Sequence, residues 1–460
     1  MTLLRDAGLV ADRAALDDLY TGWSRTIRQA AAEGRRLRLR GRGTKDSLLG
    51  GHRATPDARV LDATAALGLI DYQPSELFVT VAAGTPLVWV EAELARHGQA
   101  LAFEPPRLGP LTLPPQPGQL DDGTPRPVRV HEWHAATAGL DTVGGTVAMG
   151  WSGPARPHSG PLRDHVLGMT WINGRGQLLR SGGTVIKNVA GYDLSRLMAG
   201  SMGALGLICE VTLKVMPLPA ATATLRFDIN QDQALAAMNR WAGQPWPITG
   251  TAWFDGTLAI RLAGARPVVR HAVQHLGGEL LELGHPGEGI DPGTAHDFWM
   301  GLRDVRDGFF AQAHAVSQFD AAVLKRIHQG TARPEASPDE TVSAQQQDYL
   351  AAVHRLEKGR HHRLWRLSLP STTPALPLPG NTLIEWQGAL RWLLSDELPA
   401  RVREVLRSVG GHAQVLHTQS QDSTPAHDAT DPAVATIHRR IKQACDPHDV
   451  FDTARWTGAW

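Results

Sequence analysis

The segment from residue 139 to residue 217 constrains the fold more than any other part of this 460-residue chain. Short glycine clusters alternate there with apolar runs of strand length, such as residues 205–215. Glycine weakens a strand and costs more backbone entropy on folding than other residues do. A chain that keeps so many glycines in its expected core needs its backbone to approach another group closely. A large bound cofactor would meet that need.

Composition limits the classes of partner. Lys and Arg together number 46, as do Asp and Glu, so the formal net charge is zero. This balance argues against a nucleic-acid-binding protein, which would carry a basic surface. The two cysteines, Cys209 and Cys445, are too few for a four-thiolate iron–sulfur cluster and fit a reducing cytoplasm. Residues 1–19 do not have the pattern of a secretory signal, and no window has the roughly 20 apolar residues of a membrane span.

Hydrophobic periodicity predicts an α+β protein. In the first part we expect helices at 14–33 and 88–97, a helix beginning near residue 193, and strands at 36–40, 60–67, 76–87 and 205–215, with strand and turn alternating from 139. Composition changes after Pro217-Leu218-Pro219, where we expect a domain boundary. Beyond it we expect strands at 222–230, 248–262, 362–369, 382–394 and 412–418, and helices at 231–241, 266–276, 398–408 and 432–445. The polar segments 330–341 and 419–431 are predicted to be exposed loops or disordered.

Three glycine motifs are candidates for a phosphate or flavin site. Residues 40–44 (RGRGT) follow an expected strand, and N–H groups in such a loop can bind a pyrophosphate without a lysine. Residues 142–146 (TVGGT) would let a flat ring or a phosphate lie against the main chain, and residues 200–206 (GSMGALG) precede a strand. The structural alternatives are an ordinary turn, a β-bulge or barrel corner, and a helix C-cap, respectively. The spacing of the first motif matches neither a Rossmann fingerprint nor a P-loop.

Taken in order, these motifs resemble the FAD-binding domain of the vanillyl-alcohol oxidase and p-cresol methylhydroxylase superfamily. The resemblance runs from about residue 36 to residue 219, and it includes a V-x-A-G segment at 81–84, R-D-x-V-L-G at 163–168 and G-x-L-G-x-I at 203–208. The segments S-G-P-x-R-P at 152–157 and K-N-V-A-G-Y-D-L-S-R-L at 187–197 narrow it to the FAD-binding subunit family of glycolate oxidases.

The resemblance implies an α+β fold with three parts: a two-part FAD-binding domain at 1–219, an α+β cap domain at 220–430, and a C-terminal segment at 431–460 that returns to the FAD domain. It also implies FAD as the cofactor. The residues expected to bind FAD are Arg40, Gly41, Arg42, Gly43, Thr44, Gly84, Thr142, Gly144, Gly145, Thr146, Ser152, Gly153, Asp164, Gly206 and Ile208. Family members that tether FAD often use a His in the first glycine loop; Thr44 stands there, so we expect noncovalent FAD.

The family implies a larger FAD-containing glycolate oxidase subunit and an iron–sulfur subunit as partners, with glycolate oxidised to glyoxylate. It further implies a cytoplasmic protein whose contact with the cell membrane is made through those partners. The larger subunits carry Glu and Thr where this chain has Met202 and Ala204, and the His-containing metal motif has only a faint echo at 410–412. We therefore expect no metal and an electron-relay or structural flavin subunit.

Two other functions stay open: a self-sufficient FAD-dependent 2-hydroxy-acid dehydrogenase, and a degenerate scaffold that binds no flavin. Oxidation of a 2-hydroxy acid needs a group that holds the carboxylate and a base for the hydroxyl. Arg303, Arg366, Arg391 and His412 are candidates, but the sequence does not select among them, and a surface or salt-bridged role is the favoured interpretation of each. The catalytic residues are therefore unknown at this stage.

Overall fold

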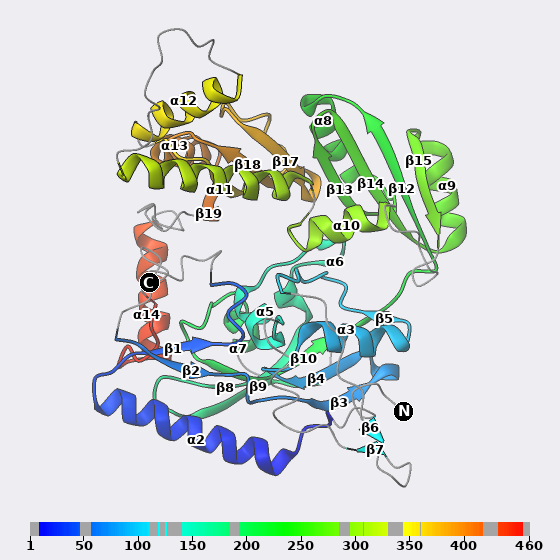
Figure 1. Ribbon diagram of the computed structural model, residues 1–460. Helices are drawn as coiled ribbons and strands as arrows, with labels where there is room; N and C mark the ends of the chain where they lie inside the picture. Colours follow the sequence, from blue (N-terminus) through cyan, green and yellow to red (C-terminus); the bar gives the residue numbers. More distant parts are fainter. Residues whose placement is uncertain are drawn as a thin grey trace.

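The computed structural model (Figure 1) describes residues 9–46, 57–109, 118–119, 125–126, 140–184, 193–284, 295–306, 308–329, 344–358, 360–416 and 431–453.

Five antiparallel strands form the first sheet, in the order β3-β4-β10-β8-β9. Their bounds are β3 Leu69–Gln73, β4 Phe78–Ala82, β8 Val166–Ile172, β9 Leu178–Gly182 and β10 Leu207–Lys214. The central strand β10 is buried from Leu207 to Leu213, because helices cover both faces of the sheet. This explains why residues 205–215 read as an almost continuous apolar run.

Helix α2 (Arg13–Ala32) covers one face of this sheet, where Tyr20, Trp23 and Ile27 pack against Cys209 (Figure 1). The opposite face packs against α3 (Leu87–Arg96) and α5 (Val143–Met149). Short pairs complete this half: parallel β1 (Leu37–Arg40) with β2 (Arg59–Asp62), β5 (Gln99–Ala100) with β11 (Met216–Pro217), and β6 (Gly118–Gln119) with β7 (Pro125–Arg126). Two short helices, α6 (Arg156–Ser159) and α7 (Leu194–Met198), lie between β7 and β11 in the chain.

Helix α5 corrects one expectation, since the sequence indicated strand and turn where this helix forms. Thr142 caps the helix, because its Oγ1 accepts a hydrogen bond from the Gly145 N–H at 3.1 Å. Gly144 lets the helix lie against β4: a Cβ there would lie 2.7 Å from the Cβ of Ala83. The paired glycines therefore serve a close helix–strand contact, which a propensity argument does not anticipate.

Eight antiparallel strands form the second sheet, in the order β15-β12-β14-β13-β17-β18-β16-β19. Their bounds are β12 Ala221–Asp228, β13 Ile248–Phe254, β14 Thr257–Gly264, β15 Glu279–Gly284, β16 Arg363–Ser368, β17 Asn381–Glu385, β18 Leu390–Ser395 and β19 His412–Leu416. The expected strand 248–262 is a hairpin, since Asp255 and Gly256 have φ values of 46° and 78° and make a tight turn. The expected strand 382–394 is likewise two strands.

Helices cover both faces of the second sheet. On one face lie α8 (Gln231–Ala242), α9 (Arg266–Leu276) and α13 (Pro399–Ser408). The other face packs against α10 (Ala295–Arg303), α11 (Gly308–His328), and Met149 and Trp151 of the first half. Helix α12 (Ala344–Glu357) packs on α11. The sequence analysis missed β15 and α10 to α12, and the expected loops 330–341 and 419–431 lie outside the described residues except for Asp431.

The C-terminal segment returns to the first half, as expected. Helix α14 (Pro432–Cys445) lies beside β1 in Figure 1, and residue Phe451 bridges Leu37 in parallel. The buried Lys442 Nζ lies 2.5 Å from Asp446 Oδ2 and donates to the Ala204 carbonyl at 3.0 Å. Asp446 also accepts hydrogen bonds from two backbone N–H groups of the tail. This buried ion pair attaches the tail to the start of β10.

The expected α+β fold and the return of the C-terminal segment to the first half are confirmed. The division into domains at 1–219, 220–430 and 431–460 stays a prediction. The first sheet is built from residues 69–214 and the second from residues 221–416.

We expect Asp446→Asn to lower the free energy of unfolding by about 3 kcal/mol, because it removes the buried carboxylate that pairs with the Lys442 ammonium and leaves only the half-exposed Asp449 as a counter-charge. The matched change is Asp449→Asn, which removes a half-exposed carboxylate 3.5 Å from the same ammonium. That variant should lose less than about 1 kcal/mol. Urea unfolding followed by tryptophan fluorescence measures both, and equal losses would contradict the assigned role of the buried pair.

Candidate functional site

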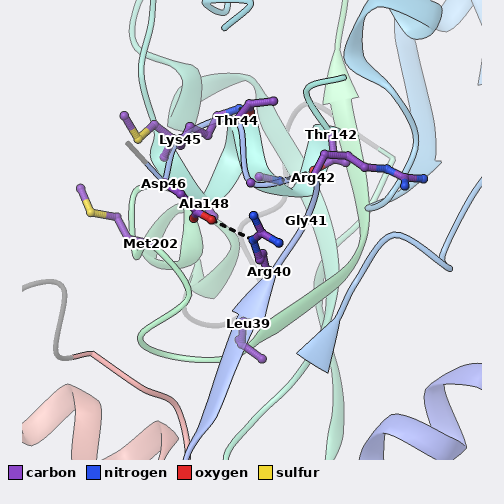
Figure 2. A pocket seen from close by; sticks show the side chains of 13 residues that line it. Leu39, Arg40, Gly41, Arg42, Thr44, Lys45, Asp46, Thr142, Ala148 and Met202 are labelled. Carbon is purple, nitrogen blue, oxygen red and sulfur yellow. Dashed lines mark hydrogen bonds and ion pairs between the residues drawn. The ribbon is translucent and has the colours of Figure 1, made fainter. Parts of the chain in front are cut away.

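The first glycine loop lines a cavity at the end of β1 (Figure 2). The loop is closed by Asp46, whose carboxylate lies 3.0 Å from Arg38 Nη2 and 2.8 Å from Arg40 Nε. Its backbone N–H donates to the Gly43 carbonyl at 3.0 Å. These contacts fold residues 40–46 back on themselves, so that the loop faces α5 across the cavity.

The cavity brings together seven of the residues expected to bind a cofactor: Arg40, Gly41, Arg42, Gly43, Thr44, Thr142 and Gly145. The sequence analysis missed the other six that line it, namely Leu39, Lys45, Asp46, Ala148, Met149 and Met202. Lys45 and Asp46 directly follow the RGRGT motif, so extension of that motif by two residues would have found them. The cavity measures about 90 Å³, which is only part of the roughly 300–1,000 Å³ typical of a cofactor-sized site.

Asp141 connects three segments around this cavity. Its Oδ1 accepts a hydrogen bond from Thr44 Oγ1 at 2.6 Å and pairs with Lys45 Nζ. Its Oδ2 accepts the backbone N–H groups of Leu108 and Gly109 at 2.6 and 2.7 Å. The glycine loop, residues 108–109 and the start of α5 are thus fixed to one buried carboxylate.

The partners of Asp141 decide its charge state. Burial alone would raise the pKa of this carboxyl, but the Lys45 ammonium and the hydrogen bonds from Thr44 and Gly109 outweigh it and lower the pKa. The contribution of Asp141 to stability is therefore present above the ordinary carboxyl pKa and is lost as the pH falls through the lowered value. At neutral pH the charges of Asp141 and Lys45 cancel, which leaves Arg40 and Arg42 as the positive charges that line the cavity beside Asp46.

Three polar atoms around the cavity are buried and have no hydrogen-bond partner among the described residues. They are the Arg42 Nε, the Thr146 Oγ1 and the Ser201 Oγ. Arg42 lines the cavity, Thr146 follows the lining residue Gly145, and Ser201 precedes the lining residue Met202. Burial lowers the pKa of Arg42, against a weaker opposing effect of Asp62. Because buried polar groups are almost always paired in folded proteins, the unpaired Arg42 Nε at the cavity favours a ligand that supplies an acceptor.

The remaining expected residues do not line this cavity. Gly84, Gly144 and Gly206 are places of close packing: a Cβ would lie 2.6 Å from the Ala66 carbonyl oxygen at Gly84 and 2.6 Å from the Trp171 ring at Gly206. Ile208 is buried in the core of the first sheet.

Three further residues that were expected to bind the cofactor make polar contacts within the protein. Ser152 Oγ accepts the Leu162 N–H at 2.9 Å, and the Gly153 carbonyl accepts the Trp386 indole N–H at 2.9 Å. Asp164 is exposed and lies 3.5 Å from Arg196. Gly153 therefore joins the two halves of the molecule rather than facing the glycine loop.

The four candidate residues of the second half have different surroundings. Arg303 is buried and pairs with Asp304 at 2.8 Å, and Arg391 is buried and donates to the carbonyls of Thr373 and Pro374. His412 is exposed at the start of β19. Arg366 differs from these, because its guanidinium lies among tryptophan rings at the face that meets the first half.

Within the described part of the chain, no helix is long and apolar enough to cross a membrane. Among the same residues, no three or more His, Cys, Asp or Glu side chains converge as they would around a metal ion.

Comparison with known proteins gives the family. The FAD binding domain family matches residues 23–113, which include the glycine loop. The chain is 35% identical to the glycolate oxidase subunit GlcE of Escherichia coli (strain K12) over 397 residues, which cover 86% of this chain and 87% of that protein. It is 38% identical to the glycolate oxidase subunit GlcD of Bacillus subtilis (strain 168), but only over 86 residues, 19% of this chain and 18% of that protein.

Among solved structures, an alkyldihydroxyacetonephosphate synthase has a TM-score of 0.53 at 14% identity, with 93% of this chain and 73% of that chain covered. This likeness supports the fold alone. The match to GlcE, by contrast, extends over nearly the whole of both chains, and the matched FAD-binding family contains the cavity-lining glycine loop. The chain therefore belongs to the family of the glycolate oxidase subunit GlcE and is an FAD-binding protein related to the FAD-dependent oxidoreductases.

Proposed function

We propose that this chain is the FAD-binding subunit of a complex that oxidises glycolate to glyoxylate, where it relays electrons or supports assembly. Its partners would be a larger FAD-containing glycolate oxidase subunit and an iron–sulfur subunit, and any contact with the inner face of the cell membrane would be made through them. The observation that carries this proposal is the 35% identity to a glycolate oxidase subunit over 86% of the chain.

The residues of the cavity fit FAD. The glycine loop brings backbone to the cavity with little side-chain bulk, and Arg40 and Arg42 supply positive charge for phosphate oxygens. The unpartnered atoms of Arg42, Thr146 and Ser201 would gain partners from a bound cofactor. The other expected residues, from Gly84 to Ile208, would shape the site through the packing described above.

FAD, when bound, supplies the two-electron redox chemistry, while the protein places the cofactor and sets its surroundings. The chain's own task in this proposal is to hold the phosphates at the glycine loop and to exclude water there. Residues 149–153, which continue from α5 to the second sheet, would extend the site toward the cap domain.

Purification of the FAD-loaded chain, alone and with its partner subunits, tests the role. The proposal expects yellow protein, flavin that is released into solution by acid, and glycolate-dependent dye reduction only in the complex. If glycolate alone bleaches the flavin absorbance of the isolated chain, the chain is a self-sufficient 2-hydroxy-acid dehydrogenase. If the purified chain is colourless and takes up no added FAD, it is a scaffold without flavin.

We expect Gly145→Ala to weaken FAD binding about tenfold, equivalent to about 1.4 kcal/mol. A Cβ at this position lies 2.9 Å from Thr142 Oγ1 and faces the cavity. The gain in helix propensity, about 1 kcal/mol, should offset a weakened cap of similar size, so the apoprotein stays folded. The control is Gly22→Ala in α2, where a Cβ meets nothing within 4 Å. FAD titration measures the effect, and equal affinities of the two variants would reject this site.

We expect Thr146→Val to stabilise the apoprotein by about 1 kcal/mol and to weaken FAD binding about fivefold, because it removes a buried hydroxyl that finds a partner only in the cofactor. The matched change is Thr170→Val, which removes a buried hydroxyl that already donates to Glu210 at 2.8 Å. That variant should lose stability and keep its FAD affinity. Thermal unfolding of apoprotein and holoprotein separates the two, and a destabilised Thr146→Val apoprotein would contradict the assignment.

A further inference from the structure

A second cavity lies between the two halves of the molecule and has a volume of about 390 Å³. The first half contributes Trp151, Arg156 and Arg163, and the second half contributes Arg366, Trp386 and Ala389. The volume falls within the roughly 300–1,000 Å³ range of small-molecule sites. Three arginines and two tryptophans in one cavity are an unusual lining for a simple packing defect, which would be apolar.

Two of the guanidinium groups lie against the same indole ring. The Arg156 Cζ is 4.5 Å and the Arg366 Cζ 5.2 Å from the centre of the Trp386 ring. Arg366 also lies 5.0 Å from the ring of Trp151. The Trp386 indole is itself held by its hydrogen bond to the Gly153 carbonyl. The cationic groups are thus positioned by aromatic contacts, which leave their N–H donors available to a ligand.

Neither guanidinium is neutralised within the described part of the chain. No side-chain hydrogen bond or ion pair joins the guanidinium of Arg156 or Arg366 to another described residue, in contrast to the buried and paired Arg303 and Arg391. Burial and the charge of Arg163 lower the pKa of Arg156, and the charge of Asp164 opposes this only in part. Burial and then the charge of Arg156 lower the pKa of Arg366 to about 10, and the nearby Glu385 opposes this only in part. The Glu385 carboxylate accepts the indole N–H of Trp392 at 2.7 Å. The cavity therefore holds excess positive charge in a poorly solvated place.

We propose that this cavity binds the carboxylate of a small 2-hydroxy acid, with Arg156 and Arg366 as the groups that hold it and Trp151 and Trp386 as its walls. A guanidinium offers two parallel N–H donors that match a carboxylate, and two of them neutralise the anion without a lysine or a metal. Arg163 is exposed and lies 4.0 Å from the Asp164 carboxylate, so its charge adds little to the cavity.

This inference rests on the proposed function, because the acid that it places in this chain is the one that the proposed complex oxidises. The glycine-loop cavity is lined by residues up to Met149 of α5, and the second cavity begins at the next residue, Gly150. A cofactor that extends from the loop along α5 would reach the wall of the second cavity. The carboxylate site and the flavin site are nevertheless made of different side chains, so they can be tested separately.

Calorimetric titration of the FAD-loaded chain, at fixed ionic strength, with glycolate, ethylene glycol and inorganic phosphate tests the proposal. We expect saturable binding of glycolate, none of ethylene glycol, which lacks the carboxylate, and weaker binding of phosphate. Arg156→Met and Arg366→Met should each weaken glycolate binding at least tenfold, and Arg366→Lys should weaken it less than Arg366→Met. The matched control is Arg403→Met, which removes a guanidinium 6.0 Å from Trp365 on the other face of the same sheet.

Flavin absorbance and thermal unfolding of every variant separate this proposal from the proposed function. The expected result is a normal flavin content in all of them. In the absence of anion, the melting temperatures of the two Met variants should be unchanged or raised, because each variant loses a half-buried cation that has no side-chain partner among the described residues. Loss of flavin from Arg156→Met or Arg366→Met would assign these arginines to the cofactor and overturn the inference. Tighter binding of phosphate than of glycolate, or equal glycolate affinity in all variants, would overturn it as well.

Discussion

The buried carboxylate of Asp141 is the interaction on which the glycine-loop site depends. It joins the glycine loop through Thr44 and Lys45, and residues 108–109 through two backbone N–H groups. Its own carbonyl accepts the Leu87 N–H at the start of α3. Without this charge, Lys45 would lie beside the cavity as an unpaired cation, and the loop would lose its attachment to α5. The cavity is therefore shaped by one acidic residue that binds no ligand itself.

The second constraint is the contact between the halves. Arg261 of the second sheet pairs with Glu104 at 2.7 Å, and the same carboxylate accepts the Ala155 N–H directly before α6. The hydrogen bond from Trp386 to Gly153 lies in the same region. These contacts fix the segment that carries Arg156 against the second sheet, whose strand β16 carries Arg366. Because the cationic cavity is composed of both halves, its geometry depends on this interface as much as on the arginines.

Sequence patterns predicted much of the fold and part of the glycine-loop cavity. Helices α2, α3, α8, α9, α13 and α14 were found within about two residues, since each has a clear apolar face or cap. The expectation of strand and turn at α5 was wrong, because paired glycines are typical of turns. Only the structure shows that Gly144 packs closely against Ala83. The RGRGT loop and two residues of TVGGT line one cavity together with Met202 of the third glycine motif. Asp141 was not expected, because it lies just outside the TVGGT motif and its partners are distant in the chain.

The sequence by itself indicated the family, the α+β class and the two glycine segments that line the first cavity. These depend on the order and spacing of residues that are close together in the chain. Only the tertiary structure decided which arginines are paired. Nothing in the sequence distinguishes Arg303, Arg366 and Arg391. In the structure, Arg303 pairs with a carboxylate and Arg391 donates hydrogen bonds to backbone carbonyls, whereas Arg366 lines a cavity. The reason is that the charge balance of a buried cation is set by residues distant in the chain, here Arg156 and Glu385.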